Sequence, residues 1–358
     1  MYSLFHKLHA MLFGYLSRMG FILAAFPNVT DIVATAIESR TRVIQDNVTN
    51  NNAGLAYIKD KGNVKTVSGG STILEEISFA ENANAGWYSG YDLLPVAAQD
   101  VLSAAQFNLK QCAVPVIISG LEELQVAGKE QMIDLMDARL GVAESTMANL
   151  VSNGFYADGT GAGGKMIVGL EAAIPPNAPA TSGRIATGTY GAIDRVTWGF
   201  WRPWASRPAA ALTNLTIQGE MNTVWGNLVR GRDRPDVIIA DTFMWQLYLS
   251  SLQAQQRFTD PNQAKLGFPV IKFMDADVVL DGGLYFPSSA YGPGAAAKTM
   301  YFLNTKYLKW RPHSKRNMVP LSPNRRYAVN QDAEVAILAF AGALTSCGDA
   351  FQGRLTSA

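Results

Sequence analysis

The chain has 358 residues, of which 48% are hydrophobic and 16% are charged, and 30 Lys and Arg against 29 Asp and Glu give a formal net charge of +1. This length exceeds what one hydrophobic core usually supports, so we expect two lobes or one elaborated domain. The balanced charge excludes an overall attraction to nucleic acid or to a membrane surface. Cys112, Cys347 and three histidines show no spacing typical of a metal site, and we expect a reduced compartment, no metal and no cofactor.

The first 26 residues combine a basic start with apolar runs and admit three interpretations: a signal peptide, an amphipathic arm, or an over-extended start with Met19 as the true initiator. Arg18 interrupts the apolar run, and the large apolar residues recur at helical spacing, which favours the arm. No stretch of the chain reaches the roughly eighteen uninterrupted apolar residues that a membrane span needs. A second short helix is predicted within residues 30–45.

Residues 64–118 form a predicted ribbon of two long strands. The first strand ends near Phe79, the second runs from Val101, and the loop 80–95 between them is rich in Asn, Gly and aromatic residues. Glu75 and Glu76 are adjacent on a strand, so their side chains point apart, and we interpret both as solvated surface. A long hairpin is unstable alone in water, so this ribbon must lie on something else.

The stretch from Gly128 to Asn153 predicts one long helix, the element around which the chain is organised. Its apolar residues recur at steps of three and four, which places a single apolar stripe along it. The stripe consists of Met132, Met136, Leu140, Ala143, Met147 and Leu150. At 1.5 Å per residue the helix would be roughly 35–40 Å long, and Asn153 with Gly154 would end it.

The second half of the chain alternates strands and helices. Helices are predicted at 218–228 and 242–255, the second capped by Asp241, and strands at 235–241, within 266–280, at 299–303 and at 334–345. This alternation predicts an α/β lobe.

A glycine-rich segment, 159–165, satisfies the G-x-G-x-x-G pattern and nearly satisfies the P-loop pattern, which would make a nucleotide-binding enzyme conceivable. However, Met166 stands where the P-loop needs Ser or Thr, and the segment follows a helix instead of a strand. We therefore interpret it as a loop. No serine elbow and no paired cysteine and histidine are evident, so we do not expect an enzyme.

Basic residues accumulate between Asp281 and Asp332, where the sequence has no acidic residue. The candidate basic cluster consists of Lys306, Lys309, Arg311, Lys315, Arg316, Arg325 and Arg326. It could contact the phosphates of a nucleic acid or the acidic residues of a neighbouring subunit. Because base-stacking aromatic residues are sparse in this segment, we favour the neighbouring subunit.

The order of these elements resembles the major capsid proteins of tailed bacteriophages, the Johnson fold. The segments that carry the resemblance are 69–91, 120–170, 260–283 and 330–353. The resemblance implies an α+β fold with an N-terminal arm, an extended two-stranded loop, a peripheral domain with a long spine helix, and an α/β axial domain. The implied boundaries are 1–50 for the arm, 51–118 for the extended loop, 119–165 for the peripheral domain, 166–329 for the axial domain and 330–358 for a final peripheral strand. The segment 166–329 is allowed to return in part to the peripheral domain.

The resemblance further implies a structural protein that assembles with itself into hexamers and pentamers of an icosahedral phage head around double-stranded DNA. Portal, scaffolding and decoration proteins would be its partners, and the virion, assembled in the host cytoplasm, its location. The alternative is the shell of a cellular nanocompartment of the same fold. The expected inter-subunit contacts on the extended loop are Ile77, Phe79, Trp87, Tyr88, Tyr91, Phe107 and Leu109.

Some members of the family lock their shells with a covalent bond from a lysine on the extended loop. This chain has no lysine between Lys65 and Lys110, so we expect a shell held by non-covalent contacts.

Overall fold

The computed structural model describes residues 52–119, 121, 129–252, 270–281, 298–321, 326–327 and 333–358. The predicted N-terminal arm and the predicted helix within 30–45 lie outside the described residues, as does Arg325. None of the helices in the described part is long and apolar enough to cross a membrane.

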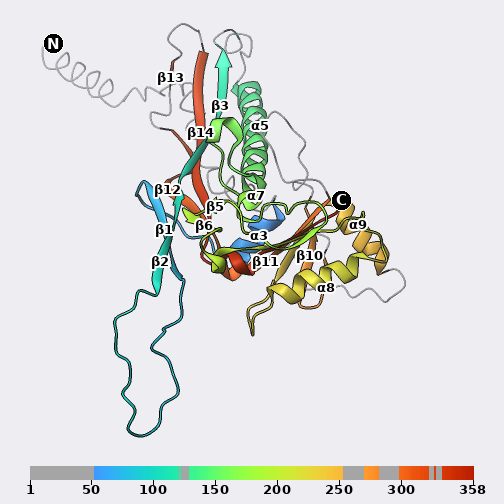
Figure 1. Ribbon diagram of the computed structural model, residues 1–358. Coiled ribbons are helices and arrows are strands. Elements are labelled where there is room, and N and C mark those ends of the chain that lie inside the picture. Colours follow the sequence, from blue (N-terminus) through green and yellow to red (C-terminus); the bar gives the residue numbers. More distant parts are fainter. Residues whose placement is uncertain are drawn as a thin grey trace, which may run out of the picture.

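A four-stranded antiparallel sheet stands upright in Figure 1 beside a long helix. Its central strand β14 (Ala333–Ser346) pairs with β12 (Leu308–Pro320), β13 (Arg326–Tyr327) and β3 (Lys110–Ser119). Since β14 comes from near the end of the chain and β3 from its first third, this sheet pairs strands that are far apart in the sequence. The predicted apolar strand at 334–345 is present as β14.

The long helix α5 (Lys129–Tyr156) has 28 residues and packs against β3. Leu140, Ala143 and Met147 are buried, so the predicted apolar stripe faces the core over the part of the helix whose side chains are described. The helix does not end at Gly154. A Cβ there would lie 3.3 Å from Ile167, so this glycine allows close packing within the last turn and is not a stop signal.

A second, mixed sheet of seven strands lies below the first. Its order is β4 (Thr181–Arg184), β7 (Trp204–Arg207), β15 (Gly353–Thr356), β11 (Thr299–Leu303), β8 (Val237–Ala240), β10 (Ala276–Leu280) and β9 (Val270–Phe273). The pairs β8–β10 and β7–β15 are parallel, and the other pairs are antiparallel. The strands predicted at 235–241, within 266–280 and at 299–303 all belong to this sheet.

Two helices, α8 (Ile217–Leu228) and α9 (Thr242–Ser251), pack against this sheet and share a core with it. Met221 and Val224 of α8 and Met244 of α9 are fully buried there. Asp241 caps α9, because its carboxylate accepts a 2.7 Å hydrogen bond from the Thr242 amide, as predicted.

The short helix α3 (Ala53–Asp60) was not predicted and lies inside the range assigned to the extended loop. Asn52 caps it by accepting from the Leu55 amide at 3.0 Å. A Cβ on Gly54 would lie 2.5 Å from Phe155, so α3 packs directly against the end of α5. The remaining short elements are α6 (Gly161–Gly164), α7 (Leu170–Ala173), β5 (Thr189–Tyr190), β6 (Ile193–Asp194) and the 3-10 turns η1 (Gly199–Trp201), η4 (Thr305–Tyr307) and η5 (Asp349–Phe351).

The glycine-rich segment forms a tight left-handed turn. Ala162, Gly163 and Gly164 all have positive φ angles, and the Gly164 carbonyl accepts a 2.5 Å hydrogen bond from Lys110 Nζ. The turn follows α5, and the helix after it, α7, has four residues, so the long helix N-terminus of a phosphate cradle does not follow the glycines. This geometry supports the loop interpretation.

Candidate assembly interface

The extended ribbon is built from two short strands, β1 (Thr72–Ser78) and β2 (Leu102–Asn108), which pair antiparallel along their whole length. It is shorter than the predicted ribbon of 64–118. The Val67 amide donates to the Pro312 carbonyl of β12, and β3 pairs with β14, so both outer parts of the predicted ribbon belong to the four-stranded sheet. The loop 79–101 between β1 and β2 extends far from the rest of the subunit (Figure 1).

The two faces of the ribbon differ in burial. On β1, Ile73, Glu75 and Ile77 alternate inward at 6%, 2% and 4% exposure, while Leu74 faces outward at 59%. On β2, Phe107 faces inward and Leu102 outward. The ribbon therefore has one face covered by its own subunit and one open face.

This burial corrects part of the predicted inter-subunit set. The side chains of Ile77 and Phe107 are buried in the core of their own subunit, which leaves them little surface for a neighbour. The Phe107 ring meets the Tyr190 ring edge-to-face at 5.3 Å, and Leu109 packs against the same core. Sequence alternation indicated which residues share a face, but not that the subunit itself covers that face.

Gly191 allows the close approach of the ribbon to the rest of the subunit. Its φ is +60°, and a Cβ there would lie 2.9 Å from the Phe107 ring. Its carbonyl accepts a 2.9 Å hydrogen bond from the Gln106 amide of β2. A larger residue would both strain the backbone and push the ribbon away.

Phe79, the first residue after β1, lies at the border between the covered and the open parts of the loop. Its ring contacts Trp198 at 5.5 Å and Phe200 at 6.4 Å, and it is half-buried. Trp198 remains 43% exposed, so this aromatic group keeps an open side.

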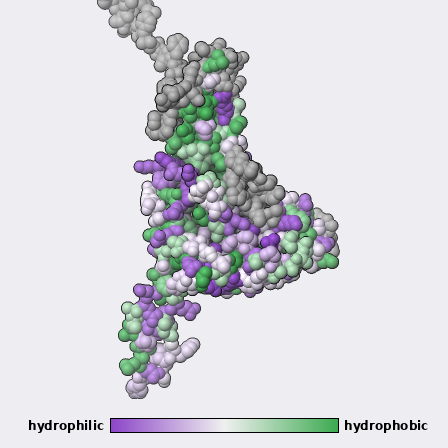
Figure 2. Space-filling view, turned by 45° about the horizontal axis from the view of Figure 1, so that its top comes forward, coloured by the Kyte–Doolittle hydropathy of each residue, from purple (hydrophilic) through white to green (hydrophobic). Residues whose placement is uncertain are grey.

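The tip of the loop is the most exposed apolar part of the described chain. Trp87 and Tyr91 are fully exposed and Tyr88 is exposed at 68%, and the neighbouring Leu93 and Val96 are nearly as open. Figure 2 shows this loop as a protrusion that carries both hydrophobic and hydrophilic residues. Burial of such side chains would contribute about 25 cal/mol per Å² of apolar area, and exposed apolar groups of this kind are typical of interaction sites, so the predicted contact at the tip stays a prediction.

Side-chain hydrogen bonds, and not a backbone ladder, hold the two limbs of the loop together. Asn84 Nδ2 donates to the Ala97 carbonyl at 2.6 Å, and Gln99 accepts from the Ala83 amide at 2.8 Å. Nearer the tip, the Ser89 amide donates to Asp92 at 2.8 Å. These contacts are all within the loop, so beyond Phe79 the loop is shaped by its own hydrogen bonds.

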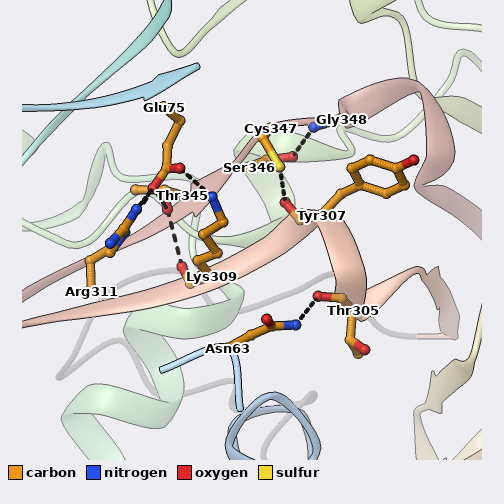
Figure 3. Close-up of polar contacts among 10 residues, drawn as sticks. All are labelled: Asn63, Glu75, Thr305, Tyr307, Lys309, Arg311, Thr345, Ser346, Cys347 and Gly348. Carbon is orange, nitrogen blue, oxygen red and sulfur yellow. Dashed lines mark hydrogen bonds and ion pairs between the residues drawn. The ribbon is translucent and has the colours of Figure 1, made fainter. Parts of the chain in front are cut away.

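Glu75 forms the charged contact between the ribbon and the four-stranded sheet (Figure 3). Its carboxylate accepts from Lys309 Nζ at 2.6 Å, from Arg311 Nε at 2.7 Å and from Thr345 Oγ1 at 3.0 Å. Burial by itself would raise the pKa of Glu75, but the hydrogen bonds from these three residues outweigh it and hold the pKa below its ordinary value. Glu75 is thus a buried carboxylate paired with two cations, and its interpretation as solvated surface was wrong.

The predicted basic cluster is not one surface. Lys309 and Arg311 are paired with Glu75, and Lys306 with Asp233 at 2.7 Å, all within the same subunit. Arg316 donates to Gln111, and Lys315 is exposed. The side chain of Arg326 lies outside the described structure. Three of the cations therefore contact acids of their own chain, which neither prediction for this segment included.

A second buried ion pair lies under the ribbon. Arg195 and Asp349 are almost completely buried and contact each other at 2.7 Å, and the Arg195 guanidinium lies over the Tyr190 ring that contacts Phe107. Burial raises the pKa of Asp349 to about 7, although the charge of Arg195 opposes the shift. Within the described part of the chain, no three His, Cys, Asp or Glu side chains gather closely enough to hold a metal ion.

Comparison with known proteins gives matches among solved structures, whereas no family model and no curated protein matches the chain. The cyanophage A-1(L) capsid asymmetric unit superposes with a TM-score of 0.60 at 16% identity, over 83% of this chain and 90% of that chain. The capsid of the native GTA particle gives 0.53 at 11% identity, over 84% and 90%. The SrpI encapsulin from Synechococcus elongatus gives 0.49 at 7% identity, over 84% and 86%, which is too low to support an argument.

At these identities the likeness shows the fold and not the function. The predicted α+β fold of tailed-phage major capsid proteins is confirmed over most of the chain. The division into arm, extended loop, peripheral domain and axial domain stays a prediction. The inter-subunit contacts of Phe79, Trp87, Tyr88, Tyr91 and the partly buried Leu109 also stay predictions.

Proposed function

We propose that this chain, which has the fold of the tailed-phage major capsid proteins, is a structural subunit that assembles with copies of itself into a closed icosahedral shell. A fold by itself does not determine function, so the proposal needs a site. The site is the extended loop, and its chemistry is that of a contact surface, since it offers exposed rings and backbone and no reactive group.

The observation that carries the proposal is the contrast between exposure and order in the loop. Trp87 and Tyr91 are fully exposed, yet the limbs behind them are held together by specific hydrogen bonds. Ordering a loop costs conformational entropy, and burial of the tip on a second copy offsets this cost. The partner is proposed to be another copy because rings of identical subunits supply the same surface to every loop.

In this proposal the loop of each subunit lies over its neighbour within hexamers and pentamers. Each contact is modest, but every subunit both gives and receives one, and the closed ring adds the contacts together. The peripheral and axial domains proposed from the sequence would then form the wall and the centre of each ring.

The cargo and partners belong to the proposal as well. Of the matches described above, the two with TM-scores above 0.5 are capsids of a cyanophage and of a GTA particle, which favours a virion head over a cellular nanocompartment. We propose that this head encloses double-stranded DNA. Portal, scaffolding and decoration proteins would be further partners, and assembly would take place in the host cytoplasm.

Negative-stain electron microscopy of the purified full-length protein tests the proposal. We expect closed shells with hexameric and pentameric units, and uniform small particles would contradict it. Extraction of shells isolated from the producing cells then separates the two kinds of cargo. Double-stranded DNA of uniform length is expected, whereas an enclosed enzyme would indicate a nanocompartment.

A further inference from the structure

Two short connections join the ribbon to the rest of the subunit. Before β1 the chain passes through Gly69 and Gly70, and Gly70 has a φ of +104°, which favours glycine. After β2 a single residue, Leu109, leads into β3 of the four-stranded sheet. Such connections allow the ribbon to change its angle to the sheet unless other contacts, such as the backbone hydrogen bond from Gln106 to Gly191 and the side chains under the ribbon, prevent it.

The side chains under the ribbon are of two kinds. Ile73, Ile77 and Phe107 hold it by apolar contact, which is strong but has no preferred direction. Glu75 is different, because its carboxylate receives charged hydrogen bonds from β12 and one from Thr345 of β14. Charge-assisted hydrogen bonds have defined lengths and directions, so they fix an angle as well as a contact.

The position of this contact matters because the loop is a long lever. From Ser78, at the end of β1, to Gly90, at the tip, the chain has twelve steps. At about 3.3 Å per residue, the tip can lie up to about 40 Å from the end of β1, here called the root of the ribbon. A tilt of about 10° at the root would then displace the tip by about 7 Å. A displacement of that size takes the aromatic side chains of the tip out of contact with any fixed surface.

We propose that Glu75 is a positioning residue for shell assembly. Glu75, Lys309, Arg311 and Thr345, here called the root cluster, fix the angle at which the ribbon leaves the sheet. They thereby determine where the tip contacts a second copy of the chain. This inference rests on the proposed function, since it assumes that the tip contacts another subunit.

The test compares Glu75→Gln with Glu76→Gln in the full-length protein. Both substitutions remove one negative charge from the same strand, but Glu75 faces the root cluster and Glu76 faces solvent. We expect the amides of β1 and β2 to exchange hydrogen at least tenfold faster in Glu75→Gln, with β8 and β10 unchanged. Shell yield by electron microscopy should fall at least fivefold in this variant, while Glu76→Gln behaves as the wild type.

Two further variants serve if Glu75→Gln is insoluble. Thr345→Val removes one donor with little change of shape, and Lys309→Met removes one cation and keeps Arg311. Both should accelerate exchange in the ribbon, Lys309→Met more than Thr345→Val.

Unchanged exchange in the ribbon of these variants would overturn the inference, as would a normal shell yield despite faster exchange. Absence of shells from the wild-type protein would instead overturn the proposed function. The exchange comparison needs no shell and would still decide whether the root cluster fixes the ribbon.

Discussion

The root and the tip of the extended loop use similar residues in opposite ways. At the root, Phe107 is covered by Tyr190, and Glu75 is neutralised by two cations of its own subunit. At the tip, Trp87 and Tyr91 are fully exposed, and the acidic Asp92 bonds only locally to Ser89. The same stretch of chain thus keeps one end inside the subunit and leaves the other end exposed. Stability and assembly should therefore respond to different substitutions.

The largest expected effect lies at the root. Phe107→Ala removes a buried ring and should lower the free energy of unfolding by about 3–5 kcal/mol, measured by denaturant unfolding of the subunit. Leu102→Ala, on the open face of the same strand, is the matched control and should change it by less than about 0.5 kcal/mol. Equal effects from the two variants would show that the ribbon has no covered face.

The buried pair under the root predicts a pH dependence. Because the folded state raises the pKa of Asp349 to about 7, the folded protein keeps a proton that the unfolded chain releases near pH 4. The free energy of unfolding therefore falls as pH rises from about 4 to about 7, with a slope from this group of at most about 1.4 kcal/mol per pH unit. The side chain of the Asp349→Asn variant does not titrate. The variant should therefore gain stability relative to the wild type as the pH rises over this range. A constant difference would contradict the raised pKa.

At the tip, the effect should appear in assembly and not in folding. Replacing Trp87 and Tyr88 together with serine should leave the unfolding midpoint of the subunit unchanged and lower the shell yield at least tenfold, because every contact between subunits would lose the same buried rings. Sedimentation measures the yield, and Ser89→Ala in the same loop is the control. Normal shells from the double variant would show that the tip is not an interface.

The smallest expected effect concerns covalent links. No lysine lies between Lys65 and Lys110, so the tip offers no amine for an isopeptide bond. Lys110 is held at the root by the Gly164 carbonyl. Shells boiled in detergent should therefore run as a single monomer band. A ladder of oligomers that survives reducing agent would contradict this and would direct attention to Lys65 and Lys110.

Local signals explain what could be predicted from the sequence. The stripe that includes Leu140 and Met147 predicts the buried face of α5, and Asp241 predicts the start of α9, because helix periodicity and capping depend on neighbours within a few residues. Gly154 was misinterpreted since its role depends on Ile167, which comes from the chain beyond the helix.

The contacts at the root of the ribbon could not be predicted, because they are made with residues far away in the sequence. Alternation correctly separated Glu75 from Glu76, but the cations that bury Glu75 lie more than 230 residues further along the chain. The same distance hid the role of Lys309 and Arg311, which the sequence grouped with Lys315 as one basic surface. Gly191 and Tyr190 gave no sequence signal of the contact with Phe107. Charge pairing and close approach between distant segments need the tertiary structure.

The connection of β2 to β3 through the single residue Leu109 has a mechanical consequence. In Figure 1 the strand β2 continues through this single residue into β3, which pairs with β14 over ten residues. Hydrogen bonds of an antiparallel pair are perpendicular to the strands, so a pull along the ribbon loads all ten pairs together in shear. Peeling, which breaks pairs one after another, would require a force across the sheet. In the closed shell proposed above, internal pressure transmitted as tension through the loops would act along the strong direction of this sheet.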